Sequence, residues 1–229
     1  MDALQLLAAT PMFEGVPPAD LEPLRRGVRR RRYGKDEYLF REGDPGSHLY
    51  VVVEGQVKIA HVAEGGGEVV FAVAGPGELF GELSLFEEDG ERSADAQALE
   101  PTECVVVARQ PVISLLVSHP QLLLRIVTRL SAYIRRKDAT VAEAAFLDIP
   151  ARVARKLLEL AETKGRGAAG GVVIDVQLSQ RTLAGMVGAS RENVNRALNR
   201  FSALGYIRQQ RGRITVLRPA ELRKRGSLS

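Results

Sequence analysis

Between residues 33 and 108 the chain consists of short β-branched or aromatic segments separated by glycine-rich turns. Strands this short, at regular spacing and with glycine at the turns, are typical of an antiparallel barrel or roll. The spacing therefore predicts a β-roll in the first half of the chain. The clearest predicted strands are residues 49–53, 56–62, 69–74 and 102–108.

The first 32 residues predict two short helices, because the segment is broken at Gly15-Val16-Pro17-Pro18. Six arginines lie between Arg25 and Arg32. We interpret this run as a solvated face that leads into a strand beginning at Tyr33.

The sequence period changes after residue 119, where a coiled-coil seam begins. Residues that follow the alternating spacing of three and four are Leu123, Ile126, Leu130, Tyr133, Lys137, Thr140 and Ala144. A helix of about 27 residues spans roughly 40 Å, which is more than a small roll can cover. The seam therefore favours pairing with a second copy of the chain, and the alternative is packing on its own roll alone.

The last third of the chain predicts a winged helix-turn-helix. Asp148 can cap a helix at 149–164, and Pro150 falls in its first turn. After a break at 165–171 come a strand at 172–176, a helix ending at Val187, and a second helix at 191–204 that follows the turn Gly188-Ala189-Ser190. Segments 206–209 and 213–217 then predict a β-hairpin wing. The fold class is α+β, with domains at 1–118, 119–147 and 148–229.

The net charge of +4 is distributed unevenly along the chain. Residues 1–148 carry a net charge of −7, from 16 Lys and Arg against 23 Asp and Glu, whereas residues 149–229 carry +11, from 16 against 5. A compact basic domain of this kind is typical of binding to the DNA phosphate backbone.

The outward face of the second helix of the motif carries hydrogen-bonding side chains. An arginine near the start of such a helix suits guanine, and a glutamate suits the cytosine amino group. The candidate DNA-binding residues are Ser179, Ser190, Arg191, Glu192, Asn193, Arg196 and Arg200.

A second candidate site lies in the predicted roll. Residues 80–85 predict a single helical turn, whose free N–H groups and Gly81 allow a phosphate to approach the backbone. Arg92 can neutralise a phosphodiester, and Glu82 can accept from a ribose hydroxyl. Leu83 and Ser93 complete the set. The alternative is a surface salt bridge between Glu82 and Arg92.

Other classes of protein are disfavoured. Cys104, the one cysteine, lies in an apolar run that predicts an inert buried strand, although a redox regulator acting through it stays an alternative. The three histidines show no metal-ligand spacing, and no acid and base pair indicates an enzyme. No signal peptide or membrane span is evident, so we expect a cytoplasmic location.

From about Phe13 to Leu217 the chain resembles the cyclic-AMP receptor protein and FNR family of bacterial regulators, which dock on DNA through a helix-turn-helix and bend it. The motifs that carry the resemblance are Gly43 and Gly55 around a Leu-Tyr-Val strand, residues 80–83 with Arg92-Ser93, residues 145–148, and residues 187–192 followed by Val194 and Arg196. The resemblance implies a phosphate site at Gly81, Glu82, Arg92 and Ser93, and base reading by Arg191, Glu192 and Arg196. It also implies TGTGA-like half-sites in a palindrome, a homodimer, and contact with RNA polymerase.

One part of the family pattern is absent. Where the family places a threonine and a serine against the adenine, this chain has Lys137 and Asp138, with Thr140 one turn further on. Cyclic AMP is the favoured effector, with another nucleotide or no required ligand as alternatives, and no tightly bound cofactor is expected. Lys137 and the partner's Asp138 could instead pair across the dimer and hold it without ligand, a hypothesis that exchanging both for alanine would test.

Overall fold

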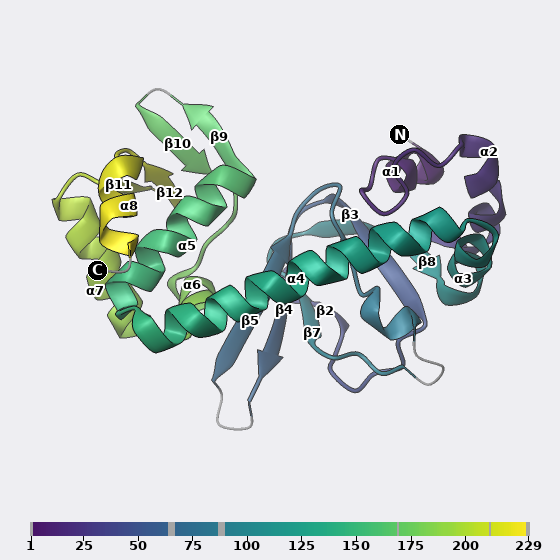
Figure 1. Ribbon diagram of the computed structural model, residues 1–229, viewed down its shortest axis with the longest axis horizontal. Coiled ribbons are helices and arrows are strands. Elements are labelled where there is room, and N and C mark those ends of the chain that lie inside the picture. The colour runs from purple at the N-terminus through teal and green to yellow at the C-terminus, as the bar shows by residue number, and fades with distance from the viewer. Residues whose placement is uncertain (1, 64–66, 87–89, 169, 211, 228–229) are drawn as a thin grey trace. The chain divides into compact units, whose positions relative to one another are not determined.

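The computed structural model describes residues 2–63, 67–86, 90–168, 170–210 and 212–227 (Figure 1). Contacts divide the chain into two units, Met1–Val62 with Phe71–Ile134, and Ala63–Val70 with Arg135–Ser229. The mixture of β-roll and helices confirms the α+β class. The domain limits given above stay a prediction.

Eight strands of the described N-terminal half form two four-stranded sheets, in the orders β1-β8-β3-β6 and β2-β7-β4-β5. Their inner faces enclose a small core that includes Tyr50, Phe80 and Cys104. The four clearest predicted strands are all present, which confirms the roll. The strands are β1 (Val28–Tyr33), β2 (Tyr38–Phe40), β3 (His48–Glu54), β4 (Val57–Val62), β5 (Glu68–Ala74), β6 (Leu79–Phe80), β7 (Asp95–Ala98) and β8 (Thr102–Ala108).

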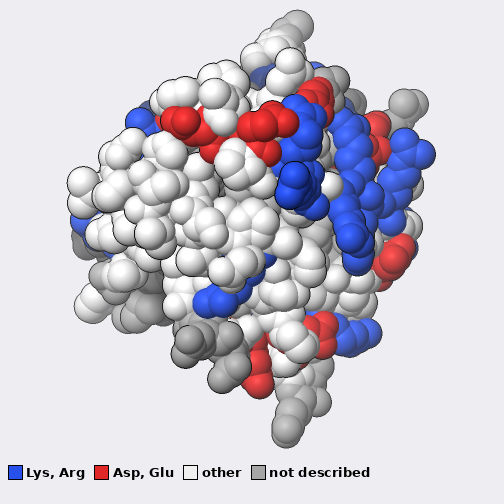
Figure 2. Space-filling model, turned by 90° about the vertical axis from the view of Figure 1, so that its right-hand side faces the viewer, with Lys and Arg blue, Asp and Glu red and all other residues white. Residues whose placement is uncertain are grey.

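The arginine run forms strand β1 itself, so the prediction that a strand begins only at Tyr33 is wrong. The run pairs with β8 from Val28 opposite Val107 to Tyr33 opposite Thr102. As an edge strand with four exposed arginines, β1 lacks the alternation that marks a half-buried strand. Figure 2 shows Lys and Arg side chains gathered in one region of this unit's surface, with Asp and Glu among them. The Glu103 carboxylate of β8 accepts hydrogen bonds from Arg30 and Arg32 of β1, at 2.7 and 2.8 Å.

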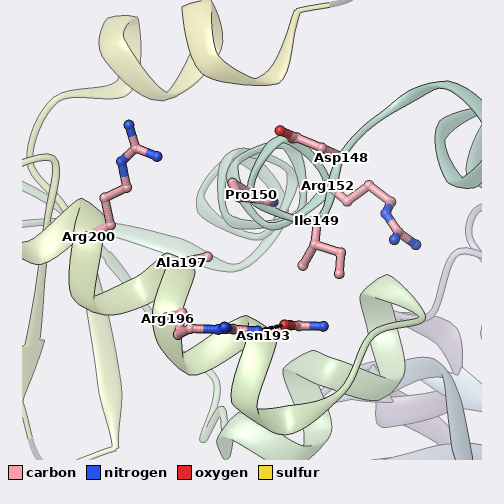
Figure 3. A pocket seen from close by; sticks show the side chains of 8 residues that line it. All are labelled: Asp148, Ile149, Pro150, Arg152, Asn193, Arg196, Ala197 and Arg200. Carbon is pink, nitrogen blue, oxygen red and sulfur yellow. Dashed lines mark hydrogen bonds between the residues drawn. The ribbon is translucent and has the colours of Figure 1, made fainter.

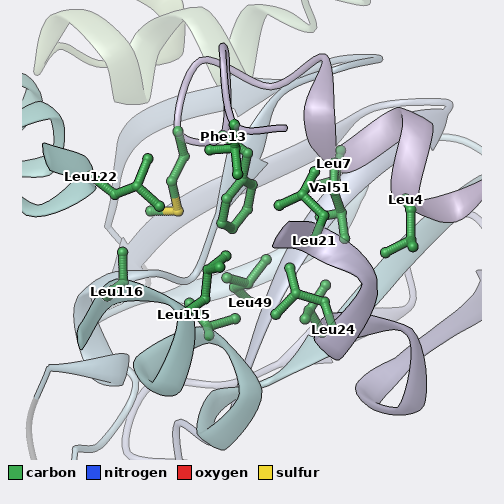
Figure 4. Close-up of a cluster of buried hydrophobic side chains, with 14 of the residues drawn as sticks. Leu4, Leu7, Phe13, Leu21, Leu24, Leu49, Val51, Leu115, Leu116 and Leu122 are labelled. Atoms are coloured by element: carbon green, nitrogen blue, oxygen red, sulfur yellow. The ribbon is translucent and has the colours of Figure 1, made fainter. Parts of the chain in front are cut away.

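The N-terminal segments and the next helix cover the other face of the first sheet. They are α1 (Ala3–Ala8), α2 (Pro18–Leu21), the 3₁₀ helix η1 (Glu22–Gly27) and α3 (Arg109–Ser118). Their leucines converge with Phe13 on Leu49 and Val51 of β3, as Figure 4 shows. This core packs against one face of the sheet, and the small core that includes Tyr50 and Phe80 packs against the other.

The predicted long helix is present as α4 (Pro120–Phe146). Its side chains are described up to Thr128 and then at 130, 131, 134, 135 and 146. Leu122 and Ile126 are buried in the roll's core, whereas Leu124, Val127 and Ile134 are more than half exposed. No single helix of the described chain is long and apolar enough to cross a membrane. Only α3 with the start of α4, bent by 108°, meets that test as a pair.

The second unit combines helices α5 (Ile149–Lys164), α6 (Gln180–Val187) and α7 (Arg191–Ala203) with a sheet of order β11-β12-β10-β9. The predicted helices and wing are confirmed. Residues 165–171 are not simply a break, because β9 pairs with β10 along its full length. The sequence analysis also missed a last helix, α8 (Pro219–Gly226). The strands are β9 (Gly165–Ala168), β10 (Gly171–Ile174), β11 (Ile207–Gln210) and β12 (Arg213–Val216).

Candidate functional site

Arg92 is the central residue of the candidate site in the roll, and it is only 4% exposed. Its Nη1 donates to the carbonyl oxygen of Gly81 at 2.8 Å and to Ser84 Oγ at 2.9 Å, and its Nη2 donates to the carbonyl oxygen of His48 at 2.6 Å. The guanidinium also lies 4.1 Å from the ring centroid of Phe40 and 5.5 Å from that of Tyr50. Three acceptors and two aromatic rings therefore fix its position.

This fixed guanidinium still has an unused donor. Its Nε is buried and has no hydrogen-bond partner among the described residues. Burial lowers the pKa of Arg92, because desolvation penalises the charged form, although Tyr50 acts against that shift. A buried cation with neutral carbonyl partners is stabilised further when an anion joins it.

The backbone around Arg92 permits close approach. Gly81 has a φ of +78°, which glycine adopts readily, and a Cβ there would lie 2.8 Å from Arg92 Nη1. A Cβ on Gly46 would lie 2.1 Å from that of Ser84. Side chains larger than hydrogen at Gly46 and Gly81 would displace the groups that hold Arg92.

The predicted helical turn at 80–85 is wrong in extent. Strand β6 ends at Phe80, Gly81 is left-handed, and only a 3₁₀ turn, η2 (Leu83–Leu85), follows. Pairing of Phe80 with Tyr50 of β3 extends the sheet into this segment, which a single-turn motif does not reveal. The segment therefore begins as a strand end and a tight turn, and not as the helix start that was expected.

The structure brings together some of the predicted ligand residues. Gly81 contacts Arg92 directly, and Glu82, half-buried, acts on Arg92 electrostatically. Leu83 and Ser93 are exposed beside them. The side chains of Lys137, Asp138 and Thr140, all on α4, lie outside the described residues.

Sequence reasoning missed the groups that hold Arg92: Ser84 Oγ, the His48 carbonyl, and the rings of Phe40 and Tyr50. A backbone carbonyl has no sequence signal. The aromatic residues were visible in the strands, but their convergence on Arg92 depends on how the two sheets pack.

The second candidate site is the pair of helices α6 and α7, each fixed by a serine cap. Ser179 Oγ accepts from the Thr182 amide at 2.9 Å, and Ser190 Oγ accepts from the Asn193 amide at 3.3 Å. Gly188 ends α6 in the left-handed conformation, with φ 60°. Both serines thus have a structural role that helps to place α7.

Helix α7 has one buried and one exposed face, as predicted. Val194, Leu198 and Phe201 are buried. Among the predicted contact residues, Arg191, Glu192, Arg196 and Arg200 are exposed, and Asn193 is half-buried. Asn193 Oδ1 accepts a hydrogen bond from Arg196. The pKa of Glu192 is lowered by its own backbone amide and by Ser190, so this carboxylate is an acceptor at neutral pH.

A basic pocket of about 490 Å³ lies between the start of α5 and helix α7 (Figure 3). Its lining residues are Asp148, Ile149, Pro150, Arg152, Asn193, Arg196, Ala197 and Arg200. Arg152 Nη1 donates to the carbonyl oxygen of Val187 at 2.8 Å, which joins α5 to the end of α6. Three arginines against one carboxylate make this pocket attractive to anions.

The hairpin of β11 and β12 adds exposed arginines to this unit. Arg208 and Arg213 are exposed, and Arg213 lies 3.8 Å from Asp175. Arg211, at the predicted tip of the wing, lies outside the described residues.

Three comparisons with known proteins agree on the class of protein. Residues 30–119 match the cyclic nucleotide-binding domain family, and residues 151–225 match the Crp-like helix-turn-helix domain family. The chain is 34% identical over 204 residues to a CRP-like cAMP-activated global transcriptional regulator of Mycobacterium tuberculosis, covering 89% of this chain and 91% of that protein. The chain belongs to the CRP/FNR family of transcription regulators.

Further CRP/FNR members extend the comparison. The cyclic AMP receptor protein of Thermus thermophilus is 33% identical over 216 residues, which cover 94% of this chain and 96% of that protein. Among solved structures, a c-di-GMP-responsive global regulator of Xanthomonas campestris has a TM-score of 0.73 at 27% identity, covering 87% of this chain and 99% of that one. Regulators of this fold therefore answer to more than one nucleotide.

In this CRP/FNR regulator, Cys104 has the environment of a core residue. It is fully buried, and burial raises the pKa of its thiol to about 12. No group of three metal-ligating side chains occurs in the part of the chain that the structure describes. The thiol therefore stays protonated and shielded at neutral pH.

We predict that Cys104 is unreactive in the folded protein. Iodoacetamide at pH 8 should label it only after unfolding, and Cys104→Ser should leave the response of DNA binding to peroxide unchanged. Because the folded pKa exceeds the ordinary value of 9.0, the free energy of unfolding should be unaffected below pH 9 and should fall as the pH rises from 9 towards 12. Rapid labelling of the native protein would contradict this.

Proposed function

We propose that this protein is a homodimer whose affinity for a palindromic DNA site is controlled by a cyclic nucleotide bound in the roll. The observation that carries the proposal is the buried Arg92 guanidinium, held by carbonyls and aromatic rings with one donor unused. Cyclic AMP is the proposed effector, because relatives at 33 and 34% identity are named for it.

Each ligand residue has a proposed role. The cyclic phosphate accepts from Arg92 and Ser93 and approaches the backbone at Gly81, while Glu82 accepts from the ribose hydroxyl and Leu83 borders the site. Charge-assisted bonds of this kind contribute about 1.5 to 3 kcal/mol each. The base faces α4, where Lys137, Asp138 and Thr140 set its selectivity.

We propose that α7 enters the major groove of TGTGA-like half-sites about one helical turn apart. Arg191, Glu192 and Arg196 read base edges. The position of α7 on the DNA phosphate backbone is fixed by Ser179, Ser190, Asn193 and Arg200. The pocket beside Arg152 suits a DNA phosphate.

Dimerisation is proposed to use a different face of α4 from the predicted seam, because the seam residue Ile126 is buried in the roll's core and Leu130 packs against that core. The proposed face carries Leu124, Val127 and Ile134, which are 70, 57 and 58% exposed. An apolar seam on a helix of this length is stabilised by a second copy. As a cytoplasmic regulator the dimer would contact RNA polymerase, and we expect no turnover of the nucleotide.

The proposed mechanism is allosteric. The nucleotide joins the roll to α4, and residues 147–150, between α4 and α5, reorient the two basic domains so that both α7 helices fit successive grooves. The coupling requires only a few kcal/mol of differential affinity between two states.

The test is fluorescence anisotropy on a labelled TGTGA palindrome at fixed moderate salt, with scrambled DNA as control. Cyclic AMP should tighten binding to the palindrome by at least about tenfold, equivalent to ~1.4 kcal/mol of coupling, and should leave scrambled DNA unaffected. Tight binding to the palindrome that cyclic AMP does not change would mean that the protein responds to another effector or to none. The next nucleotide to test would be c-di-GMP. Equal binding to both DNAs would contradict base reading by α7.

A further inference from the structure

Helix α8 is packed into the second unit and is not a loose tail. Its Leu222 is fully buried. Its Gly226 lies so close to α5 that a Cβ there would be 2.8 Å from Arg155 Cγ. Two features of the sequence favour this helix. Pro219 lies in its first turn, where no intrahelical N–H is needed, and basic residues lie in its last turn, where they interact favourably with the helix dipole.

An ion pair joins the end of α8 to the start of α5. Arg225 Nη2 donates to Asp148 Oδ2, while Asp148 Oδ1 accepts from the Ala151 amide at 2.9 Å. The Asp148 carboxylate therefore caps α5 through Oδ1 and binds Arg225 of α8 through Oδ2. The Arg225 guanidinium is the main cause of a lowered pKa for Asp148.

The position of Asp148 makes this pair relevant to α7. Asp148 is the only acidic residue among those lining the described basic pocket, which also contains Arg196 and Arg200 of α7. An unneutralised carboxylate there would repel a DNA phosphate and attract the same arginines that α7 presents to DNA.

We propose that Arg225 is a positioning residue for DNA reading: it holds Asp148 on the α5 cap and neutralises it, so that the arginines of α7 stay free for DNA. The inference rests on the proposed DNA-binding function. Arg225 itself acts through Asp148 and makes no contact with DNA.

The test is a double-mutant cycle of Arg225→Ala and Asp148→Asn, measured as the dissociation constant for the palindrome. Asparagine keeps a capping oxygen but carries no charge to neutralise. Arg225→Ala alone should weaken binding about tenfold, because an exposed ion pair contributes a factor of up to about five and each protomer of the dimer loses one. In the Asp148→Asn background, adding Arg225→Ala should weaken binding less than about twofold further.

Two controls separate this role from general effects of charge and folding. Arg223→Ala removes an equal charge from the same helix, where Arg223 lies 3.8 Å from Glu162, and should change binding less than about twofold. Arg225→Lys should restore most of the affinity. The slope of log K against log salt should be the same for wild type and Arg225→Ala, because no phosphate contact is lost.

Hydrogen exchange of the Ala151 amide gives a readout that does not depend on DNA. This exchange should be faster in Arg225→Ala and unchanged in Arg223→Ala, with native circular dichroism in both. The inference would be overturned if Arg225→Ala still weakened DNA binding tenfold in the Asp148→Asn background. It would also be overturned if Arg225→Ala lowered the slope of log K against log salt by about one per protomer, or left hydrogen exchange of the Ala151 amide unchanged. If the wild type did not prefer the palindrome, the proposed function would fail, and the exchange data alone would decide whether Arg225 holds the cap.

Discussion

Replacing Arg92 with alanine is expected to weaken nucleotide binding strongly. The variant loses the charge-assisted bond between the unused Arg92 donor and the phosphate, about 1.5 to 3 kcal/mol, so affinity should fall by roughly 10- to 150-fold. Isothermal titration of cyclic AMP measures the loss directly. DNA binding in the absence of nucleotide should persist, and its tightening by cyclic AMP should disappear.

The controls for Arg92 address stability. Removing this side chain leaves the carbonyls of Gly81 and His48 and the hydroxyl of Ser84 without its donors, so some destabilisation of the roll is expected. Arg92→Lys keeps the positive charge but loses the forked geometry of the guanidinium. Compared with Arg92→Ala, it should restore the stability of the roll more fully than the affinity for cyclic AMP. Arg41→Ala removes an arginine that lies over the half-buried Tyr38 ring, and should bind the nucleotide normally. An Arg92→Ala protein that bound cyclic AMP within a few-fold of wild type would show that the phosphate binds elsewhere.

The sequence predicted elements best where local chemistry determines them. Asp148 was predicted to cap α5, and it does so through an oxygen that accepts from the amide three residues further on. Ser179 and Ser190 cap α6 and α7 in the same way, although they were predicted as DNA contacts. Strand β8, whose residues 104–107 are buried on both faces, was predicted with its limits from its apolar run. The arginine strand β1 was not, because an exposed edge strand has no alternation to detect.

The part of the site that the sequence left undetermined depends on contacts between distant segments. Arg92 was identified from its spacing to Glu82, but its donors go to Gly81, Ser84 and His48, and the last of these is 44 residues away. Likewise Arg225 lies 77 residues from Asp148, at the end of an eight-residue helix that is too short to give a clear period. The burial of Arg92 and the pairing of Arg225 follow from packing that no local pattern encodes.

Replacing Arg191 with alanine is expected to have the largest effect on DNA recognition. Arg191 is exposed at the first position of α7, where a bidentate contact with guanine is worth about 1 to 3 kcal/mol. A dimer makes this contact twice, so specific affinity should fall by roughly 30-fold or more, whereas affinity for scrambled DNA should change only about threefold, by one lost charge per protomer. A matched control is Lys156→Ala, which removes an equal charge from α5, where Lys156 pairs with Glu159.

Base substitution in the half-site then identifies the contact itself. Wild type should lose affinity when the guanine read by Arg191 is changed, but Arg191→Ala should bind both sequences equally, because the discriminating group is gone. The Glu192 carboxylate repels phosphates at neutral pH. If the protein used α7 only for non-specific attachment to DNA, Glu192→Ala would therefore raise its affinity for every sequence. A gain confined to scrambled DNA, with a loss on the palindrome, is the pattern that base reading requires. Equal losses of Arg191→Ala on both DNAs would instead make Arg191 a backbone contact.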